Sequence, residues 1–317
     1  MLTGSALGNF FSVRHIAILQ LCDMPLSNEL TTALMDVLHT DHRGPVTLKS
    51  TVPIGGGSIN DGYRLETSAG NFFVKVNSAD RFPSMFEAEA DGLERLSGTG
   101  ELRVPEVLAV GEILDVTFLL LEYIDPGERT PIFWERSGRR LAAMHRHTDP
   151  EFGSARDNFI GSLKQVNTRT EDWSAFFIHH RLEPQLKMAR DKKKVKPGSA
   201  FRFERLFGKL DTLFPKEPPA LIHGDLWNGN FLCDEEQDPV LIDPAVYFGH
   251  REMDVAMSRL FGGFDPEFYR AYNDVWPMEQ GWEERMDLCN LYPLLVHVNL
   301  FGGSYAQQVD AVLRRFT

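Results

Sequence analysis

Three side chains that can handle protons and metal ions stand at a spacing that phosphoryl transfer requires. Asp225 and Asn230 are five residues apart in the segment HGDLWNGN, and Asp243 ends the apolar stretch of LIDP. In-line transfer of a phosphoryl group needs one carboxylate that holds the acceptor hydroxyl, plus an amide and a second carboxylate that hold magnesium ions on the phosphates. We therefore expect Asp225 to be the catalytic group, and Asn230 and Asp243 to be ligands of Mg2+.

The neighbouring sequence favours this interpretation over an ordinary turn. Gly, Asp and Asn gather in turns because they tolerate left-handed backbone and form local hydrogen bonds. Here, however, the cluster lies between two short apolar runs, 220–222 and 240–242, and each run ends in a polar side chain. Strands present functional groups at such ends, so the segment predicts a kinase that uses ATP.

A glycine-rich loop in the first third of the chain could contact the phosphates of the nucleotide. It joins two strand-like segments, 46–52 and 63–67. Backbone N–H groups of such a loop can surround phosphate oxygens. A glycine run between strands is more often a flexible hairpin, and this one matches neither G-x-x-x-x-G-K-[ST] nor G-x-G-x-x-G. The candidate nucleotide contacts of the loop are Gly55, Gly56, Gly57 and Ser58.

A lysine within an apolar strand needs a charged partner. Lys75 lies in the strand-like FFVKV, and burial of its ammonium is costly without a carboxylate nearby. The segment 86–96 reads as a helix, and kinases pair their strand lysine with a glutamate on such a helix to hold the phosphates. Glu89 is favoured over Glu87 because it shares a helical face with the leucines that follow. The structural alternative is an edge-strand lysine that blocks aggregation.

These segments resemble the fructosamine (ketosamine) kinases, relatives of the aminoglycoside and choline phosphotransferases. The resemblance covers about residues 25–317 and rests on HGDLWNGN, IDPAVYFGHREMDVAMSRLFGGF, FVKVN followed by MFEAEADGLERL, and the stretch from Asn158 to Leu182. The aminoglycoside enzymes share only a less specific motif, in which HGD is followed by an Asn and, further on, by an Asp. At Ser58 some relatives carry a cysteine, so a thiol redox switch in this loop is not implied.

The resemblance implies a protein-kinase-like fold and a nucleotide site at the junction of its two lobes. Backbone groups near Glu122, Tyr123 and Ile124 are implied to pair with adenine, although the residue pattern itself shows only a strand that runs into the turn DPG. ATP and Mg2+ are the implied cofactors. The implied reaction is phosphorylation at C3 of a ketosamine, the product of sugar attack on an amine.

The coarse architecture is of the α+β class, with two lobes. A small antiparallel sheet plus one helix is expected in an N-terminal nucleotide-binding lobe, 25–124, and a large, mostly helical lobe for catalysis and substrate is expected in 125–317. Ser27 is expected to cap a further helix that runs to Leu38, and 1–24 could be a poorly ordered leader. The strands are expected near 46–54, 62–67, 72–76, 107–113 and 116–122, and the helices near 82–97, 132–147, 171–192, 199–213, 251–261 and 280–315.

Three residues are candidates for the substrate pocket. Trp227, inside the catalytic segment, could form a wall for a sugar, and His250 and His297 could line the same pocket, although packing roles are as plausible for each of them. His223 is expected to orient the catalytic loop through hydrogen bonds. His145 and His147 are two apart and His179 and His180 are adjacent, so neither pair shares a helical face that could bind a metal ion.

The composition fits a soluble, cytoplasmic enzyme. The 317 residues are 43% hydrophobic and 25% charged, which is enough for a large core. The net charge of −12 argues against nucleic acid and anionic membranes as partners, because phosphate backbones require clustered Lys and Arg. The widely spaced cysteines suggest neither a disulfide framework nor a zinc cluster. No run of about 18 apolar residues predicts a membrane span.

The expected activity is transfer of the ATP γ-phosphoryl group to a ketosamine, either a small molecule or a glycated protein, which would lead to deglycation. One alternative is an aminoglycoside- or choline-type phosphotransferase. A second is a catalytically silent binding protein of kinase fold, and the joint presence of Lys75, Asp225, Asn230 and Asp243 argues against it. The sequence does not indicate the preferred ketosamine, the choice between free and protein-bound acceptors, or the oligomeric state.

Overall fold

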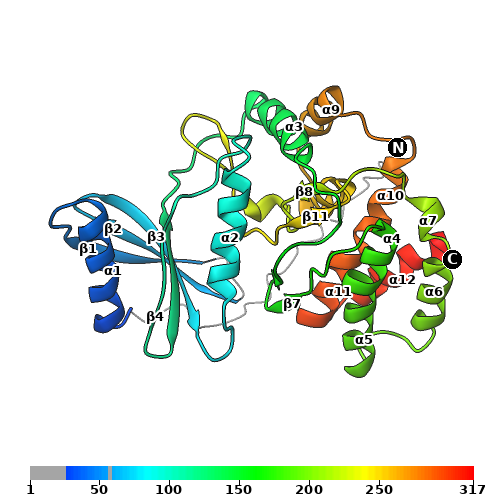
Figure 1. Ribbon diagram of the computed structural model, residues 1–317, viewed down its shortest axis with the longest axis horizontal. Coiled ribbons are helices and arrows are strands. Elements are labelled where there is room, and N and C mark those ends of the chain that lie inside the picture. The colour runs from blue at the N-terminus through cyan, green and yellow to red at the C-terminus, as the bar shows by residue number, and fades with distance from the viewer. Residues whose placement is uncertain (1–25, 56–58) are drawn as a thin grey trace, which may run out of the picture.

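The computed structural model describes residues 26–55 and 59–317, and a sheet-rich N-terminal part and a helical C-terminal part are plainly visible (Figure 1). The suggested leader, 1–24, and the loop residues Gly56, Gly57 and Ser58 lie outside the described residues. The division of the chain at residues 124 and 125 stays a prediction.

Five antiparallel strands form the sheet of the N-terminal part, in the order β1-β2-β3-β5-β4. The bounds follow the expected ones closely, because each strand is an apolar or alternating run that a turn interrupts. The strands are β1 (Leu48–Ile54), β2 (Asp61–Thr67), β3 (Gly70–Ser78), β4 (Val107–Ile113) and β5 (Val116–Glu122).

Two helices cover opposite faces of this sheet. Helix α1 (Asn28–Asp41) begins as expected at Ser27, whose hydroxyl accepts a 3.1 Å hydrogen bond from the backbone N–H of Leu30. Along β5, Leu120 packs in the cluster that contains the buried leucines of α1, whereas Leu119 and Leu121 pack with helix α2 (Met85–Ser97). Side chains of a strand alternate between its two faces, so α2 lies on the face that is turned toward the helical part (Figure 1).

The C-terminal part is mostly helical and surrounds a large apolar core. The expected helix 171–192 consists of α4, a π-helical segment, Phe177–Leu182, and α5 in direct succession. The expected helix 280–315 is wrong as one element, because the chain forms three helices there. The helices are α3 (Pro131–His145), α4 (Trp173–Phe176), α5 (Glu183–Asp191), α6 (Ser199–Phe207), α7 (Leu210–Leu213), α8 (Glu252–Met257), α9 (Pro266–Val275), α10 (Trp282–Cys289), α11 (Leu291–Leu300) and α12 (Tyr305–Phe316).

Helix α9 was not expected from the sequence, although a signal for it is present. Asp265 is its N-cap and accepts a 2.9 Å hydrogen bond from the backbone N–H of Glu267, and Pro266 occupies the first helical position. Asp followed by Pro is a typical helix start. The helix packs against α3 (Figure 1). Within the described residues, no helix is long and apolar enough to cross a membrane.

Three short antiparallel strand pairs connect the helices around the site. The apolar run 220–222 forms β8 (Ala220–Ile222), which pairs with β11 (Tyr247–Gly249). The run before Asp243 forms β10 (Pro239–Leu241), which pairs with β9 (Phe231–Cys233). A third hairpin, β6 (Asn158–Ile160) and β7 (Leu163–Gln165), was not expected as strands. The fold-class prediction, an α+β chain with an antiparallel sheet and a mostly helical second part, is confirmed.

Candidate active site

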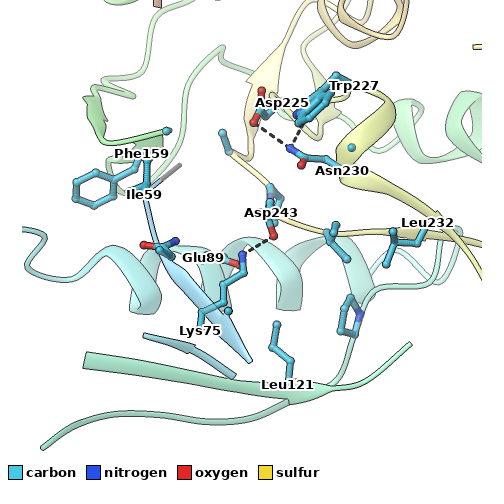
Figure 2. Close-up of a pocket in the computed structure, with 18 of the residues that line it drawn as sticks. Ile59, Lys75, Glu89, Leu121, Phe159, Asp225, Trp227, Asn230, Leu232 and Asp243 are labelled. Atoms are coloured by element: carbon cyan, nitrogen blue, oxygen red, sulfur yellow. Dashed lines mark hydrogen bonds and ion pairs between the residues drawn. The ribbon is translucent and has the colours of Figure 1, made fainter. Parts of the chain in front are cut away.

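A cavity of about 730 Å³ lies between the sheet with α2 and the helical part, and Figure 2 shows the side chains around it. The sheet and α2 contribute one wall, which includes Lys75 and Glu89. The catalytic segment and the residues after β10 contribute the opposite wall, which includes Asp225, Asn230 and Asp243. The fold therefore brings together five candidate residues that are distant in the sequence.

Hydrogen bonds link Asp225 and Asn230 across the turn that lies between them. The Nδ2 amide of Asn230 donates hydrogen bonds to the backbone carbonyl of Asp225 at 3.0 Å and to its Oδ2 at 2.9 Å. A side-chain amide has one carbonyl oxygen besides these donors. Since both donor bonds point at Asp225, the Oδ1 atom of Asn230 is left as the group that can bind a cation.

His223 links this loop to the strand that precedes Asp243. Its Nε2–H donates to the carbonyl of Ile242 at 2.9 Å, and its Nδ1 accepts from the backbone N–H of Asp225 at 3.2 Å. Burial lowers the pKa of His223, and a neutral ring is the form that can donate at one nitrogen and accept at the other. The contacts match the orienting role that was expected for this residue.

The carboxylate of Asp254 holds the backbone of the same loop, and the sequence analysis did not single out this residue. Its Oδ2 accepts from the backbone N–H of His223 at 2.7 Å, and its Oδ1 accepts from that of Gly224 at 2.9 Å. His145 donates to the same carboxylate from α3 at 3.1 Å. The available signal was a carboxylate between Met253 and Val255 on a short apolar helix, because a buried carboxylate requires partners of this kind.

Gly224 permits the close approach of the loop to the chain after Asp243. Its φ is +83°, and a Cβ atom there would lie 2.2 Å from the backbone carbonyl oxygen of Ala245. A side chain would therefore push the catalytic loop away from the segment that carries the second carboxylate. The glycine of HGD is required by the backbone packing of the site.

Lys75 lies between two carboxylates. Its Nζ is 2.6 Å from Oε1 of Glu89 and also contacts Oδ1 of Asp243 (Figure 2). Burial disfavours the ammonium form, yet the charges of Asp243 and Glu89 outweigh it and raise the pKa of Lys75. Glu87, the alternative partner, is exposed on the other side of α2. Lys75 therefore remains a cation that faces the cavity.

Asp225 has an unusual environment for an aspartate. Burial and the negative charge of Asp243 raise its pKa to about 7, against the opposing hydrogen bond from Asn230. A carboxylate whose pKa lies near neutrality can accept and return a proton most effectively. The environment of Asp225 therefore suits a group that holds a hydroxyl proton.

The oxygen atoms of this site fit a magnesium ion. Asp243 has a left-handed backbone with φ of 55°, which Asp tolerates better than most residues, and it lines the same cavity as Asn230 and Asp225. Mg2+ prefers oxygen ligands and is usually held by one or two carboxylates plus phosphates and water. Among the described residues, no group of three or more His, Cys, Asp and Glu side chains is placed so that it could hold a metal ion.

The candidate nucleotide contacts border the same cavity. Gly55 lines it, as do the three hinge residues Glu122, Tyr123 and Ile124. The carboxylate of Glu122 is paired with Arg103, which also contacts Asp234. The carboxylate of Glu122 is therefore occupied by an arginine that the sequence analysis did not single out, and contact of the backbone at 122–124 with a base stays a prediction.

Two of the three substrate candidates line the cavity and one does not. Trp227 and His297 are both at its wall. His250, in contrast, is fully buried: its Nε2 donates to the carbonyl of Pro215 at 3.3 Å and its ring packs against Trp173. The expectation for His250 as a pocket group is therefore wrong, because its side chain points into the core of the helical part.

The five-stranded sheet carries a lysine–glutamate pair, and the helical part places a loop with a carboxylate and an amide opposite it. This arrangement defines a phosphotransferase of protein-kinase-like fold. The family model described as fructosamine kinase matches residues 30–317. The chain belongs to the fructosamine kinase family, as the motifs indicated.

Individual relatives agree with this membership. A probable ketoamine kinase of Enterococcus faecium is 41% identical and aligns with 84% of this chain and 94% of its own length. A protein-ribulosamine 3-kinase, chloroplastic, of Arabidopsis thaliana is 41% identical, over 82% of this chain and 80% of its own length. The solved structure of a candidate fructosamine-3-kinase from Thermobifida fusca is 38% identical, with a TM-score of 0.77 over 84% of this chain and 93% of that one.

A more distant structure shows the common fold alone. The crystal structure of an aminoglycoside phosphotransferase is 17% identical, with a TM-score of 0.61 over 89% of this chain. At this distance the likeness carries no information on the acceptor. The acceptor must be argued from the residues of the cavity.

Proposed function

We propose that this protein is an ATP-dependent ketosamine 3-kinase. The observation that carries the proposal is the joint placement of Lys75, Asp225, Asn230 and Asp243 around one cavity, in a chain of the fructosamine kinase family. Each of these four residues has the chemical type and the partners that its role requires. The substrate class follows from the family, since its named relatives include ketoamine and ribulosamine kinases.

The roles divide between the two walls of the cavity. Lys75, held by Glu89, binds phosphate oxygens, and the loop that begins at Gly55 covers them. Asn230 and Asp243 would hold Mg2+, which when bound neutralises charge on the transferred phosphoryl group. Asp225 holds the acceptor hydroxyl and takes its proton. These assignments give a role to four of the charged residues that line the cavity, namely Lys75, Glu89, Asp225 and Asp243.

Phosphorylation at C3 has a chemical consequence for the product. Phosphate is a far better leaving group than hydroxide once the adjacent C2 carbonyl enolises. The phosphorylated ketosamine can therefore eliminate phosphate and then release the amine. Repair of glycated amines, whether free or on proteins, is the outcome that we propose.

The cavity favours this acceptor over an aminoglycoside. Aminoglycosides carry several ammonium groups, and each of these needs an acceptor when it leaves water. The described lining residues that come from the β6–β7 hairpin, Met257 and helix α11 include no carboxylate. A polycation would leave most of its charges unpaired there.

We also propose a cytoplasmic location. Cys233 and Cys289 are free and buried, and unpaired thiols are typical of a reducing compartment. Relatives from Arabidopsis thaliana and Oryza sativa are named chloroplastic; that location belongs to those proteins.

The acceptor class can be tested directly. Purified protein with Mg-ATP should release ADP in the presence of at least one of fructosamine, ribulosamine and erythrulosamine substrates of low molecular weight. An aminoglycoside and choline serve as controls in the same assay. Turnover of an aminoglycoside without turnover of any ketosamine would overturn the assignment, and ATP binding without any turnover would indicate a silent binding protein.

Substitution of Glu89 tests the role of the lysine pair. Glu89→Gln should lower kcat/KM for ATP by about tenfold or more, because removal of a charged hydrogen-bond partner leaves the buried Lys75 ammonium less well held. Glu87→Gln, on the exposed side of the same helix, is the matched control and should behave as the parent. Equal kinetics of the two variants in an ATP titration would show that Glu89 does not support phosphate binding.

A further inference from the structure

Aromatic side chains gather at the cavity wall beside the catalytic loop: Trp227, His297 and Phe301 line the cavity, and Phe261 and Tyr305 pack against His297. We call this cluster the aromatic rim. The ring of His297 lies at its centre, with centroid distances of 4.6 Å to Phe261, 5.4 Å to Phe301 and 5.0 Å to Tyr305. Phe261 also meets Trp227 edge-on at 6.3 Å. The rim therefore consists of Trp227, Phe261, His297, Phe301 and Tyr305.

Two phenylalanines of the rim are open to solvent. Phe301 is 50% exposed and Phe261 is 37% exposed. A single exposed apolar side chain needs no explanation, and Phe201 on α6 is such a case, because it is 63% exposed and belongs neither to the cavity lining nor to the rim. Two exposed phenylalanines around one histidine at a cavity wall form a contiguous apolar surface, which is typical of a ligand contact.

The backbone holds these rings in place at some cost. Phe261 has a left-handed backbone with φ of 58°, which is unfavourable for a residue of this size. Each exposed phenylalanine is followed by a glycine pair, Gly262–Gly263 and Gly302–Gly303, and all four glycines have positive φ. Glycine adopts a positive φ without strain, so the unfavourable conformation is that of Phe261 alone. Backbone strain at such a residue concentrates at ligand sites.

The cavity next to the rim is nearly free of charge. Its described lining residues from the β6–β7 hairpin, from Met257 and from α11 include no Lys, Arg, Asp or Glu. Asn158 is committed to the fold: its Nδ2 donates to the carbonyl of Val246 at 2.9 Å and its Oδ1 accepts from Gln165 at 2.8 Å. The wall offers no cation for an anionic substituent.

His297 supplies the single directed polar group of this wall. Its Nδ1 lies 2.8 Å from the carbonyl of Pro293, and a carbonyl can only accept, so Nδ1 carries the proton. Burial lowers the pKa of His297, which favours the neutral ring. The Nε2 atom is then a hydrogen-bond acceptor, and no partner for it occurs among the described residues.

We propose that the aromatic rim binds the amine half of the ketosamine, so that the enzyme distinguishes acceptors by the substituent on nitrogen. The nitrogen of a ketosamine is a secondary ammonium at neutral pH and lies only a few bonds from C3. With the C3 hydroxyl on Asp225, this ammonium faces the rings, which attract a cation through their π-electrons, and its N–H can donate to Nε2 of His297. An apolar substituent then covers Phe261 and Phe301. This inference rests on the proposed function and adds the acceptor subsite to it.

Two ketosamines that differ only on nitrogen test the proposal. The parent should phosphorylate N-benzyl fructosamine with a lower KM than N-methyl fructosamine. Phe261→Ala and Phe301→Ala should each raise the KM for the benzyl compound by about five- to tenfold more than the KM for the methyl compound, because the lost ring contact involves only the larger substituent. Phe201→Ala is the matched control, and its two KM values should equal those of the parent.

The possible outcomes separate this inference from the function on which it rests. Loss of the benzyl preference in the two rim variants, with melting temperatures close to that of the parent, supports the rim as the amine subsite. A parent without such a preference, or rim variants that affect both ketosamines equally, overturns the inference and leaves the ketosamine kinase assignment standing. A parent that phosphorylates no ketosamine overturns both.

Discussion

Asp243→Ala is expected to abolish phosphoryl transfer and to leave the fold intact. The carboxylate is one of two candidate ligands for Mg2+ and also contacts Lys75, so its removal takes away a metal ligand and one of the two carboxylates that hold Lys75. Electrostatic stabilisation by such groups contributes several kcal/mol, and we expect a loss in kcat of about a thousandfold or more. Steady-state kinetics with saturating Mg-ATP and ketosamine would measure it.

Two comparisons make this result interpretable. Alanine is disfavoured in the left-handed backbone of Asp243, so a fall in melting temperature of about a few degrees would reflect the backbone alone. Asp243→Asn tolerates that backbone and should lose activity without this loss of stability. Asp211→Ala, at an exposed position on α7, is the control for surface carboxylates. Near-normal activity of Asp243→Ala with an intact melting transition would show that Asp243 is merely a turn residue at the end of a strand.

The sequence predicted those contacts of the site whose geometry depends on short spacing along the chain. One turn connects Asp225 to Asn230, and this short connection brings the two residues within hydrogen-bond distance. The pairing of Lys75 with Glu89 was predicted from helical periodicity, which placed Glu89 and the buried Leu93 on one face of α2. Both predictions depended on contacts within one element or between neighbouring elements.

The contacts that the sequence did not reveal involve distant segments. Asp254 supports the catalytic loop across about 30 residues. Its apolar neighbours indicate that it is buried, but they do not indicate that its partners are two backbone N–H groups of that loop. His250 was a candidate for the pocket, with packing as an equal alternative, and its side chain faces Trp173 and Pro215, which come from other parts of the chain. The direction in which a side chain points depends on tertiary packing that spacing alone does not encode.

Asp225→Asn is expected to separate catalysis from nucleotide binding. The variant keeps the size of the side chain, and its amide oxygen can still accept from Nδ2 of Asn230, so the loop should retain its shape. It cannot take a proton from the acceptor. General-base and positioning roles typically contribute about 10²–10⁴-fold in rate, so kcat should fall by about that factor.

The affinity for ATP decides which role Asp225 has. Asp225 is assigned to the acceptor hydroxyl, whereas Asn230 and Asp243 are assigned to the metal ion on the phosphates. Calorimetric titration of the Asp225→Asn variant with ATP and magnesium should therefore give a Kd within about a few-fold of the parent, well below the roughly tenfold change that 1.4 kcal/mol of lost binding would produce. If ATP binding is lost together with activity, Asp225 is a metal ligand, and the proton must be taken by another group. If turnover is unchanged, the raised pKa of Asp225 reflects only its burial beside Asp243 and has no part in the reaction.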